Sequence, residues 1–508
     1  MSSSRSSKSP STMARVVRVL LAIVTSVALI AALAVLSIGP MPRWFVDRVS
    51  GKATASHRIV QQLIESYCPA RMELPDSTDW GDSEYRASDG DLKTSSSFAA
   101  FGSVYASSAS PFAGTSGADA LTLNAPDNPR STDAMVANDT SGAARLLDTN
   151  LLKAVDGSGH AGVTASHASK GDLRGLSAAT CTSTAMSRSF LLPGTATGSS
   201  LLMVIANPSS KATTVTIQVT GTSAAGPMSL ATSGTATVAA GGETTVDLSA
   251  AAPDQQGLYV TVTSDVMPVA AYVRAVDADG LTPKGSDFMM PAADASTLNA
   301  IPSVEEGDAV TLYAYGKTSG DVTLSWVTDD GLSSIGRKSI RADRVTVFDL
   351  GKAPKGAHGV LATGDDDFTA VARAVRSGAD GQEDFALVSA TTPSGSSGAA
   401  LPDGLDATVA LVNTTTREAE VTLTMMDDTG KASEAKDVTI KANSAVTVKG
   451  EGRAVLVEDA DHAVSWGVRL TGGGLDPATV AGLAAYGPTA LSVREETIRS
   501  SQDNTIVR

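Results

Sequence analysis

Aromatic residues are scarce in this sequence of 508 residues: Phe, Trp and Tyr make up 4% of it, against 42% for all hydrophobic residues. Its hydrophobic cores must therefore be small and aliphatic, built from Val, Ala and Leu. Sites that cleave sugars commonly present aromatic platforms, so the scarcity also counts against a glycoside hydrolase. The length allows several domains, because one core rarely grows beyond about 250 residues.

Residues for metal and catalytic sites are also few. The chain has two cysteines and five histidines. None of them has the spacing of a zinc site, and His160 and His167 fall in a Gly/Ser-rich stretch, so we predict no metal and no cofactor. No Gly-x-Ser-x-Gly elbow stands at a strand-to-helix turn. We therefore predict no catalytic residues and no enzymatic activity.

Acidic residues are absent from the start of the chain. No acid precedes Asp47, whereas the whole chain has a net charge of −15. A basic tail followed by an acidic body argues against nucleic acid as a partner, because phosphate binding needs clustered Lys and Arg.

A long apolar run follows the basic tail. Residues 19–39, VLLAIVTSVALIAALAVLSIG, contain no charge. About 20 apolar residues can cross the hydrocarbon core as a helix, so we predict a transmembrane helix at 19–39 and a basic cytoplasmic tail at 1–18. Arg15 and Arg18 flank the inner end, and Trp44 and Phe45 suit the outer interface.

The alternative for this run is a cleaved signal peptide, whose apolar part is typically shorter, about 7 to 15 residues. Both interpretations imply export. We favour the uncleaved anchor, with the N-terminus in the cytoplasm and the C-terminal domains outside the cytoplasmic membrane.

The two cysteines, Cys68 and Cys181, suit an oxidising exterior. There an isolated pair usually forms a disulfide, and closing such a loop contributes about 4 kcal/mol in the chain-entropy model. The alternative is two separate buried thiols, which behave as small hydrophobic groups. We predict the disulfide.

Between the anchor and residue 190 the pattern is weak. Scattered apolar positions predict a juxtamembrane helix at 40–68, ending before Pro69. Residues 69–189 are rich in Ser and Gly, and we expect an irregular segment with some strands. Residues 491–508 are expected to form a C-terminal tail.

An internal repeat dominates the remainder. Three segments begin with an apolar residue and proline, at Leu192-Pro193, Ile301-Pro302 and Leu401-Pro402, and each continues with matching strand patterns. Runs such as TTVTIQV alternate apolar and polar residues, as half-buried antiparallel strands do. We predict tandem immunoglobulin-like antiparallel β-sandwich domains. The predicted repeats cover residues 190–292, 293–392 and 393–490.

Two groups of charged residues accompany the repeats. The acidic runs at 329–330, 365–367 and 427–428 suggest calcium ligands, but tight turns explain Asp and Gly better, and we favour turns. Arg274, Arg376 and Arg469 each follow a late strand. One interpretation is that these arginines form a ladder of anion contacts. The interpretation that we favour is that they face outward at sheet edges and prevent pairing with further strands.

A family resemblance rests on the runs GLSAATC from Gly175, SRSFLLPGTATGSSLLMVIANPSSKATTVTIQV, VAAGGETTVDL and AAYVRAV, together with Cys68-Pro69. The sequence resembles an uncharacterised family of actinobacterial membrane-anchored cell-envelope proteins. That family is a domain of unknown function, often encoded near glycosyltransferases. The resemblance implies a cell-envelope setting and no chemistry.

Three functions remain open. The first is a non-enzymatic membrane-anchored scaffold or docking protein outside the cytoplasm, which would support envelope polysaccharide assembly through a protein or polysaccharide partner. The second is a surface adhesin or ligand-binding receptor, with its site in the distal domain. The third, least favoured, is a wall-polymer hydrolase, which requires a pocket with convergent polar groups.

Overall fold

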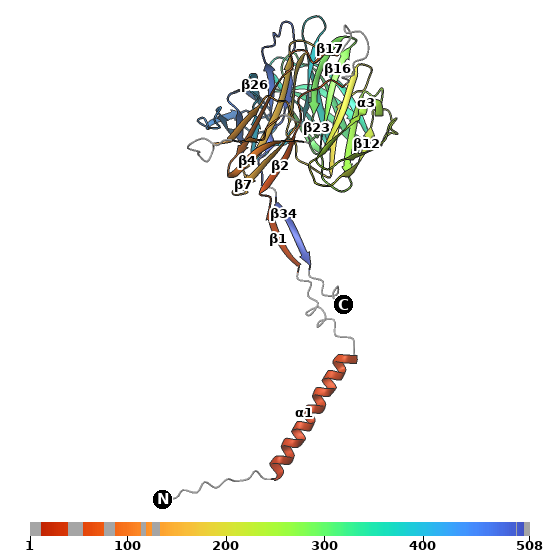
Figure 1. The fold of residues 1–508 in the computed structure, drawn as a ribbon, viewed down its shortest axis with the longest axis vertical. Coiled ribbons are helices and arrows are strands. Elements are labelled where there is room, and N and C mark those ends of the chain that lie inside the picture. Colours follow the sequence, from red (N-terminus) through yellow and green to blue (C-terminus); the bar gives the residue numbers. More distant parts are fainter. Residues whose placement is uncertain are drawn as a thin grey trace. The chain divides into compact units, whose positions relative to one another are not determined.

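The computed structural model describes residues 12–38, 54–75, 87–112, 118–123, 133–493 and 495–501 (Figure 1). The chain forms two compact units: residues 1–60 with 495–508 make up the first, and residues 61–494 make up the second. The fold is mainly β, as predicted, and its sheets are antiparallel.

The first unit holds the helix α1 (Thr12–Ile38), in which Arg15 and Arg18 lie. In the described part of the chain, no helix combines the length and the apolar character needed to cross a membrane. Trp44 and Phe45, predicted at the outer interface, lie outside the described residues.

The first unit also holds a two-stranded ribbon. Strand β1 (Thr54–Val60) pairs antiparallel with β34 (Glu495–Ser501), from Thr54 opposite Ser501 to Val60 opposite Glu495. The helix predicted at 40–68 is therefore wrong for the described part of that range, because β1 and β2 (Leu63–Cys68) are strands. The partner of β1 comes from the other end of the chain, which local periodicity does not reveal.

The second unit contains one strand arrangement four times, in four domains that are numbered 1 to 4 along the chain. The strand positions within each domain are counted from its N-terminal strand. In domain 2, one sheet has the order β10-β15-β12-β13 and the other β14-β11-β16-β17. The two sheets face each other across a shared apolar core. The strands are β10 (Ser187–Pro193), β11 (Ser199–Asn207), β12 (Thr213–Thr220), β13 (Thr235–Val238), β14 (Gly242–Asp247), β15 (Gly257–Ser264), β16 (Ala270–Asp279) and β17 (Thr282–Met289), with a short helix α3 (Leu248–Ala251) after β14.

Domain 3 repeats this order with one variation. Its strand β23 takes the places of both the sixth and the seventh strand, so the two sheets join into one of seven strands. The strands are β18 (Ser296–Pro302), β19 (Ala309–Gly316), β20 (Gly320–Thr328), β21 (Gly331–Ile340), β22 (Arg344–Lys352), β23 (Ala357–Ser377) and β24 (Glu383–Ser389).

Domain 4 has the orders β28-β27-β30-β25 and β29-β26-β31-β32, and β33 extends the first sheet beyond β25. Its strands are β25 (Ser396–Ala400), β26 (Leu405–Asn413), β27 (Ala419–Met426), β28 (Lys436–Ile440), β29 (Ala445–Gly450), β30 (Ala454–Glu458), β31 (Val464–Gly472), β32 (Ala484–Tyr486) and β33 (Thr489–Ala490).

Domain 1 is a fourth copy, with the orders β2-β7-β4-β5 and β6-β3-β8-β9. The range 69–189, expected to be irregular, therefore belongs to a regular sandwich wherever it is described. Besides β2, its strands are β3 (Lys93–Phe101), β4 (Val104–Pro111), β5 (Leu121–Thr122), β6 (Met135–Asp139), β7 (Arg145–Leu151), β8 (Gly159–Ala168) and β9 (Gly175–Thr180).

Buried serines explain why the hydrophobicity pattern of the sequence does not predict the strands of domain 1. Ser96 and Ser97 of β3 are buried, and their hydroxyls bond with Thr164 Oγ1 at 3.1 Å and Asn138 Oδ1 at 2.9 Å. A buried hydroxyl costs little when it has a partner, so a polar strand can occupy a core position.

The strand order differs from that of an immunoglobulin constant-type domain. There the sheets run A-B-E-D and C-F-G, so the seventh strand lies next to the sixth. Here the seventh strand of each domain lies next to the second, as β16 lies next to β11. The antiparallel pairing is confirmed, and the immunoglobulin-like order is not found.

The four domains close into a ring. The first strand of each domain contacts the second and seventh strand positions of the next: β10 contacts β19 and β23, β18 contacts β26 and β31, and β25 contacts β3 and β8. Between domains 1 and 2, Tyr67 stacks on Tyr272 with ring centroids 6.0 Å apart.

Apolar residues and last strands hold this ring together. The core of domain 4 is continuous with residues of domain 1, and that of domain 2 with Tyr313 and Tyr315 of domain 3. The last strands β9, β17, β24 and β32 contact one another inside the ring. A row of separate domains is therefore wrong: residues 61–494 are one closed body.

The predicted disulfide is confirmed. Cys68 at the end of β2 bonds to Cys181 just after β9, so the bridge ties the first strand of domain 1 to the end of its last strand. Gly162 of β8 makes room for it, because a Cβ there would lie 2.3 Å from Cys181 Sγ.

Candidate functional site

Two adjoining cavities lie where the inner strands of the ring end. The first, here called the axial cavity, has a volume of about 300 Å³, and the second about 290 Å³. Their shared lining comes from the ends of domains 1, 2 and 4: Thr180, Met290, Pro291, Pro488 and Ala490. The axial cavity also includes Gln61, near the start of the body, and Val493, near its end.

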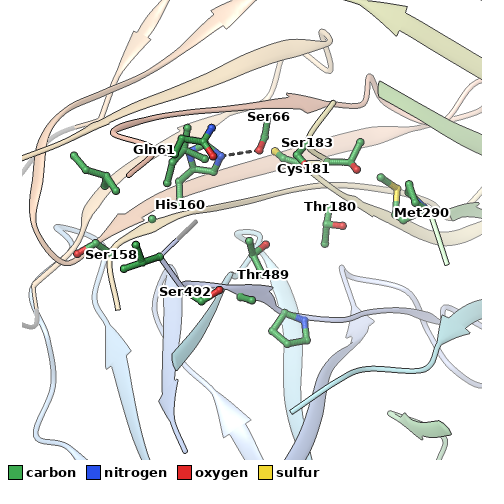
Figure 2. Close-up of a pocket in the computed structure, with 18 of the residues that line it drawn as sticks. Gln61, Ser66, Ser158, His160, Thr180, Cys181, Ser183, Met290, Thr489 and Ser492 are labelled. Carbon is green, nitrogen blue, oxygen red and sulfur yellow. Dashed lines mark hydrogen bonds between the residues drawn. The ribbon is translucent and has the colours of Figure 1, made fainter. Parts of the chain in front are cut away.

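The lining of the axial cavity is polar without being acidic. Hydroxyl groups come from serine and threonine residues of domains 1 and 4 and of the segment after β9, and Figure 2 labels several of them. Among the described residues that line the two cavities, Arg188 is charged, and none is Asp or Glu. In a chain with 54 acids, this pattern suits neutral or anionic polar ligands.

Ser66 and His160 meet in the wall of the axial cavity (Figure 2). Ser66 Oγ lies 2.8 Å from His160 Nε2, and Thr149 Oγ1 lies 2.9 Å from His160 Nδ1. His160 was considered above only as a metal ligand, and Ser66 was not singled out. Their separation of 94 positions leaves no local signal. No group of residues suited to hold a metal occurs among the described residues.

Two buried carboxyl groups, here called the axial carboxyls, join the inner strands. Asp287 of β17 accepts hydrogen bonds from the backbone N–H of Ala178 in domain 1 and of Leu387 in domain 3. Asp384 of β24 accepts from Leu176 N in domain 1 and Leu483 N in domain 4. Each carboxyl thus links its own domain to two others.

A buried glutamine just before β24 extends this set. Gln382 accepts from Ala481 N at 2.8 Å and donates to the carbonyl oxygens of Ala481 and Arg174. Gly175 and Gly285 leave room for Asp384, since a Cβ at either would lie within 2.8 Å of its carboxyl group. Closure of the ring therefore depends on particular small and polar residues.

Burial raises the pKa of both axial carboxyls well above the usual range, and their mutual repulsion adds to the rise for Asp384. A group whose pKa is higher in the folded chain stabilises the fold fully at low pH and loses that effect as pH rises through the folded pKa. We therefore expect the body to be more stable in mildly acidic than in alkaline buffer.

Asp384→Asn should weaken this pH dependence. The amide oxygen can still accept from Leu176 N and Leu483 N, and the amide nitrogen would replace Oδ1, which has no hydrogen-bond partner. Thermal unfolding from pH 5 to pH 9 measures the effect, and Asp461→Asn at an exposed position is the control. An unchanged pH profile in Asp384→Asn would contradict the assignment.

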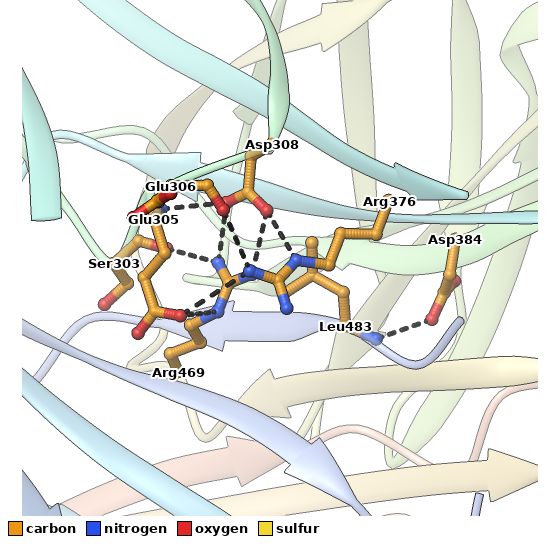
Figure 3. A network of polar contacts seen from close by, with 8 residues as sticks. All are labelled: Ser303, Glu305, Glu306, Asp308, Arg376, Asp384, Arg469 and Leu483. Carbon is orange, nitrogen blue, oxygen red and sulfur yellow. Dashed lines mark hydrogen bonds and ion pairs between the residues drawn. The ribbon is translucent and has the colours of Figure 1, made fainter. Parts of the chain in front are cut away.

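The three arginines considered for a ladder of anion contacts form ion pairs within the chain. Arg274 pairs with Glu73 of domain 1. Arg469 pairs with Asp308 of domain 3 at 2.9 Å and with Glu305 at 3.2 Å, and Arg376 pairs with Asp308 at 2.7 Å (Figure 3). The outward-facing interpretation is wrong for Arg469, whose side chain is 1% exposed.

The residue equivalent to Arg274 and Arg469 in domain 3 is Arg373, not Arg376. Arg373 lies opposite Thr311, as Arg469 lies opposite Thr408. It pairs with Asp277 of domain 2 at 2.6 Å. The signal was present in the sequence, since Arg-Ala-Val occurs at both 274–276 and 373–375.

The acidic runs have structural roles. Asp427 Oδ1 accepts from Thr429 Oγ1 and from the backbone N–H of Thr429 and of Lys431 in the turn after β27, and these hydrogen bonds lower its pKa. Residues 329–330 form the turn between β20 and β21. The run at 365–367, however, lies within β23 rather than in a turn.

Fold and site together define a class of protein: a closed ring of four eight-position β-sandwiches, with a hydroxyl-lined cavity where the inner strands end. The chain belongs to a family of unknown function, DUF5719, whose model matches residues 135–451. The match begins in domain 1 and ends in domain 4, so it includes domains 2 and 3 completely. Among curated proteins, no match to the chain is found.

Proposed function

We propose that the chain is a membrane-attached docking protein of the cell envelope, with the ring body outside the cytoplasm and a partner held at the axial cavity. The observation that carries this proposal is the cavity itself, whose described lining contains no acid in an acidic chain. A partner with neutral or anionic polar groups would meet hydroxyls and Arg188 there without repulsion.

Two further features support the setting. Residues 19–39 carry no charge and follow a basic segment, which favours a membrane anchor with its N-terminal side in the cytoplasm. The Cys68–Cys181 disulfide favours an oxidising compartment. The membrane attachment rests on the sequence alone, as do an actinobacterial source and a link to polysaccharide assembly.

The alternative function, a surface adhesin, is not supported by the arrangement of the domains. It assumed a membrane-distal domain at the end of a stalk, whereas domain 4 packs against domain 1 within the ring. No distal tip in the described body singles out domain 4 as a binding end.

Crosslinking in intact cells tests the docking proposal. Ala490 is exposed and lines both cavities, so Ala490→Trp should obstruct them. Ala240→Trp, at an exposed turn of domain 2, is the matched control. The proposal expects an envelope partner to be captured by the natural chain and by Ala240→Trp, but not by Ala490→Trp. Equal capture by both variants, or none by the natural chain, would refute it.

A further inference from the structure

The pair Ser66 and His160 has the geometry of a nucleophile beside a base. Ser66 comes from β2 and His160 from β8, the two side chains are 7% and 2% exposed, and both border the axial cavity. Their Oγ–Nε2 distance of 2.8 Å is that of a hydrogen bond (Figure 2). A serine held against an imidazole beside a cavity is the arrangement that activates a hydroxyl for attack.

Hydrogen bonds behind the imidazole determine which ring nitrogen carries the proton. Ser107 Oγ donates to the carbonyl oxygen of Asp148 at 3.2 Å and lies 2.7 Å from Thr149 Oγ1. A serine has one hydroxyl proton, so when Ser107 donates it to Asp148 the Thr149 hydroxyl donates to Ser107.

Thr149 Oγ1 is then left to accept a proton from His160 Nδ1, 2.9 Å away. In this tautomer Nε2 carries no proton and accepts the hydroxyl proton of Ser66. The hydrogen-bond chain therefore orients the histidine as a base toward the serine. Thr149 acts as a positioning residue, because it does not line the cavity.

We propose that Ser66 and His160 hydrolyse a short-chain acyl ester bound in the axial cavity. Ser66 Oγ bonds to the ester carbonyl carbon while its proton moves to His160 Nε2. The bond from that carbon to the alcohol oxygen then breaks, and the alcohol leaves with the proton. Water attacks the acyl-serine next, giving one proton through His160 back to Ser66 Oγ, and the carboxylic acid is released.

The lining indicates the class of ester. Ile64, Leu151 and Val155 offer an apolar wall for the acyl group, while Thr489 and Ser492 offer hydroxyls to the alcohol portion. A volume of about 300 Å³ lies at the lower limit for ligand pockets, which favours a short acyl chain. The substrate is thus a small acyl ester of a polar alcohol.

This activity goes beyond the docking function and does not depend on it. Thr149 holds the histidine without the negative charge that a carboxylate would supply, so turnover is expected to be slow. Covalent labelling of Ser66 is therefore a more sensitive measurement than turnover.

The test treats the full chain, purified in detergent, with a fluorophosphonate probe, and locates the label by mass spectrometry. We expect phosphonylation at Ser66, none in Ser66→Ala, and labelling slowed about 100-fold or more in His160→Gln. Labelling of the natural chain should slow in acidic buffer, because a protonated imidazole cannot accept the serine proton, and His160→Gln should lose that pH dependence. Ser223→Ala, at an exposed position of domain 2 that does not line the cavity, should label at the natural rate.

Absence of label on the folded natural chain, or equal labelling of Ser66→Ala, would overturn the proposal. If His160→Gln does not fold, Thr149→Val replaces it, since it keeps the side-chain shape and removes the acceptor for Nδ1–H. Slowed labelling of Thr149→Val supports the proposal, and a natural rate overturns it. None of these results depends on whether a docking partner is captured.

Discussion

Asp308→Ala is expected to lower the free energy of unfolding by about 3–5 kcal/mol, because it leaves a buried guanidinium without its main partner. The Asp308 side chain is fully buried and accepts from both terminal nitrogens of Arg469, at 2.9 and 3.0 Å, and from Arg376 Nε at 2.7 Å. Arg469 belongs to domain 4 and Asp308 to domain 3, so the loss weakens the contact between them.

Chemical denaturation of the purified chain measures this change. Lys449→Ala is the control, because the pair of Lys449 with Glu451 is exposed on both sides at 3.9 Å and such pairs contribute little. A change in Asp308→Ala as small as that of the control would mean that the pair is not buried between domains in solution.

Removal of the disulfide is the second change that we expect to lower the free energy of unfolding strongly. In the chain-entropy model, a loop that spans 113 positions stabilises the folded state by about 4–5 kcal/mol. The variant with both Cys68→Ala and Cys181→Ala should lose that amount, and with it the constraint that ties β2 to the end of β9. Thermal unfolding under oxidising conditions measures the loss.

A reductant provides the control for this variant. Reduction should lower the melting temperature of the natural chain and leave that of the double variant unchanged. Equal melting temperatures of the oxidised natural chain and the double variant would contradict a structural role for the bridge.

The parts of the fold visible in the sequence are those with strong local patterns. In β12, Val215, Ile217 and Val219 alternate with polar residues, and all three are buried, as the period of two predicts. Asn207 and Asn413 mark the end of the second strand in two copies. Each buried amide donates to one carbonyl oxygen of the following turn and to two at the end of the fourth strand.

The parts that the sequence could not show depend on residues brought together by ring closure. The strands of domain 1 use buried serines whose hydrogen bonds exist only after folding, so their pattern resembles a loop. Strand β1 is defined by pairing with β34 at the opposite end of the chain. Nothing in the sequence distinguishes Asp384 from the other acidic residues, because its partners come from domains 1 and 4 and lie next to it only in the folded ring.

The candidate site was hidden for the same reason. Ser66, Thr149 and His160 lie on three strands of domain 1, and only the sandwich aligns them. The cavity lining adds segments from domains 2 and 4 that no local motif connects. The sequence could predict that domain 2 is a sandwich, but not that its last segment would border a cavity.

Small-angle X-ray scattering of residues 61–494 tests the closed ring most directly. A compact body of that length should have a radius of gyration of roughly 22 Å and a nearly globular distance distribution. Four sandwiches arranged in a row would give a radius of gyration roughly twice as large and a long tail in that distribution. A value near the compact figure is the result that the ring predicts, and the extended result would contradict it.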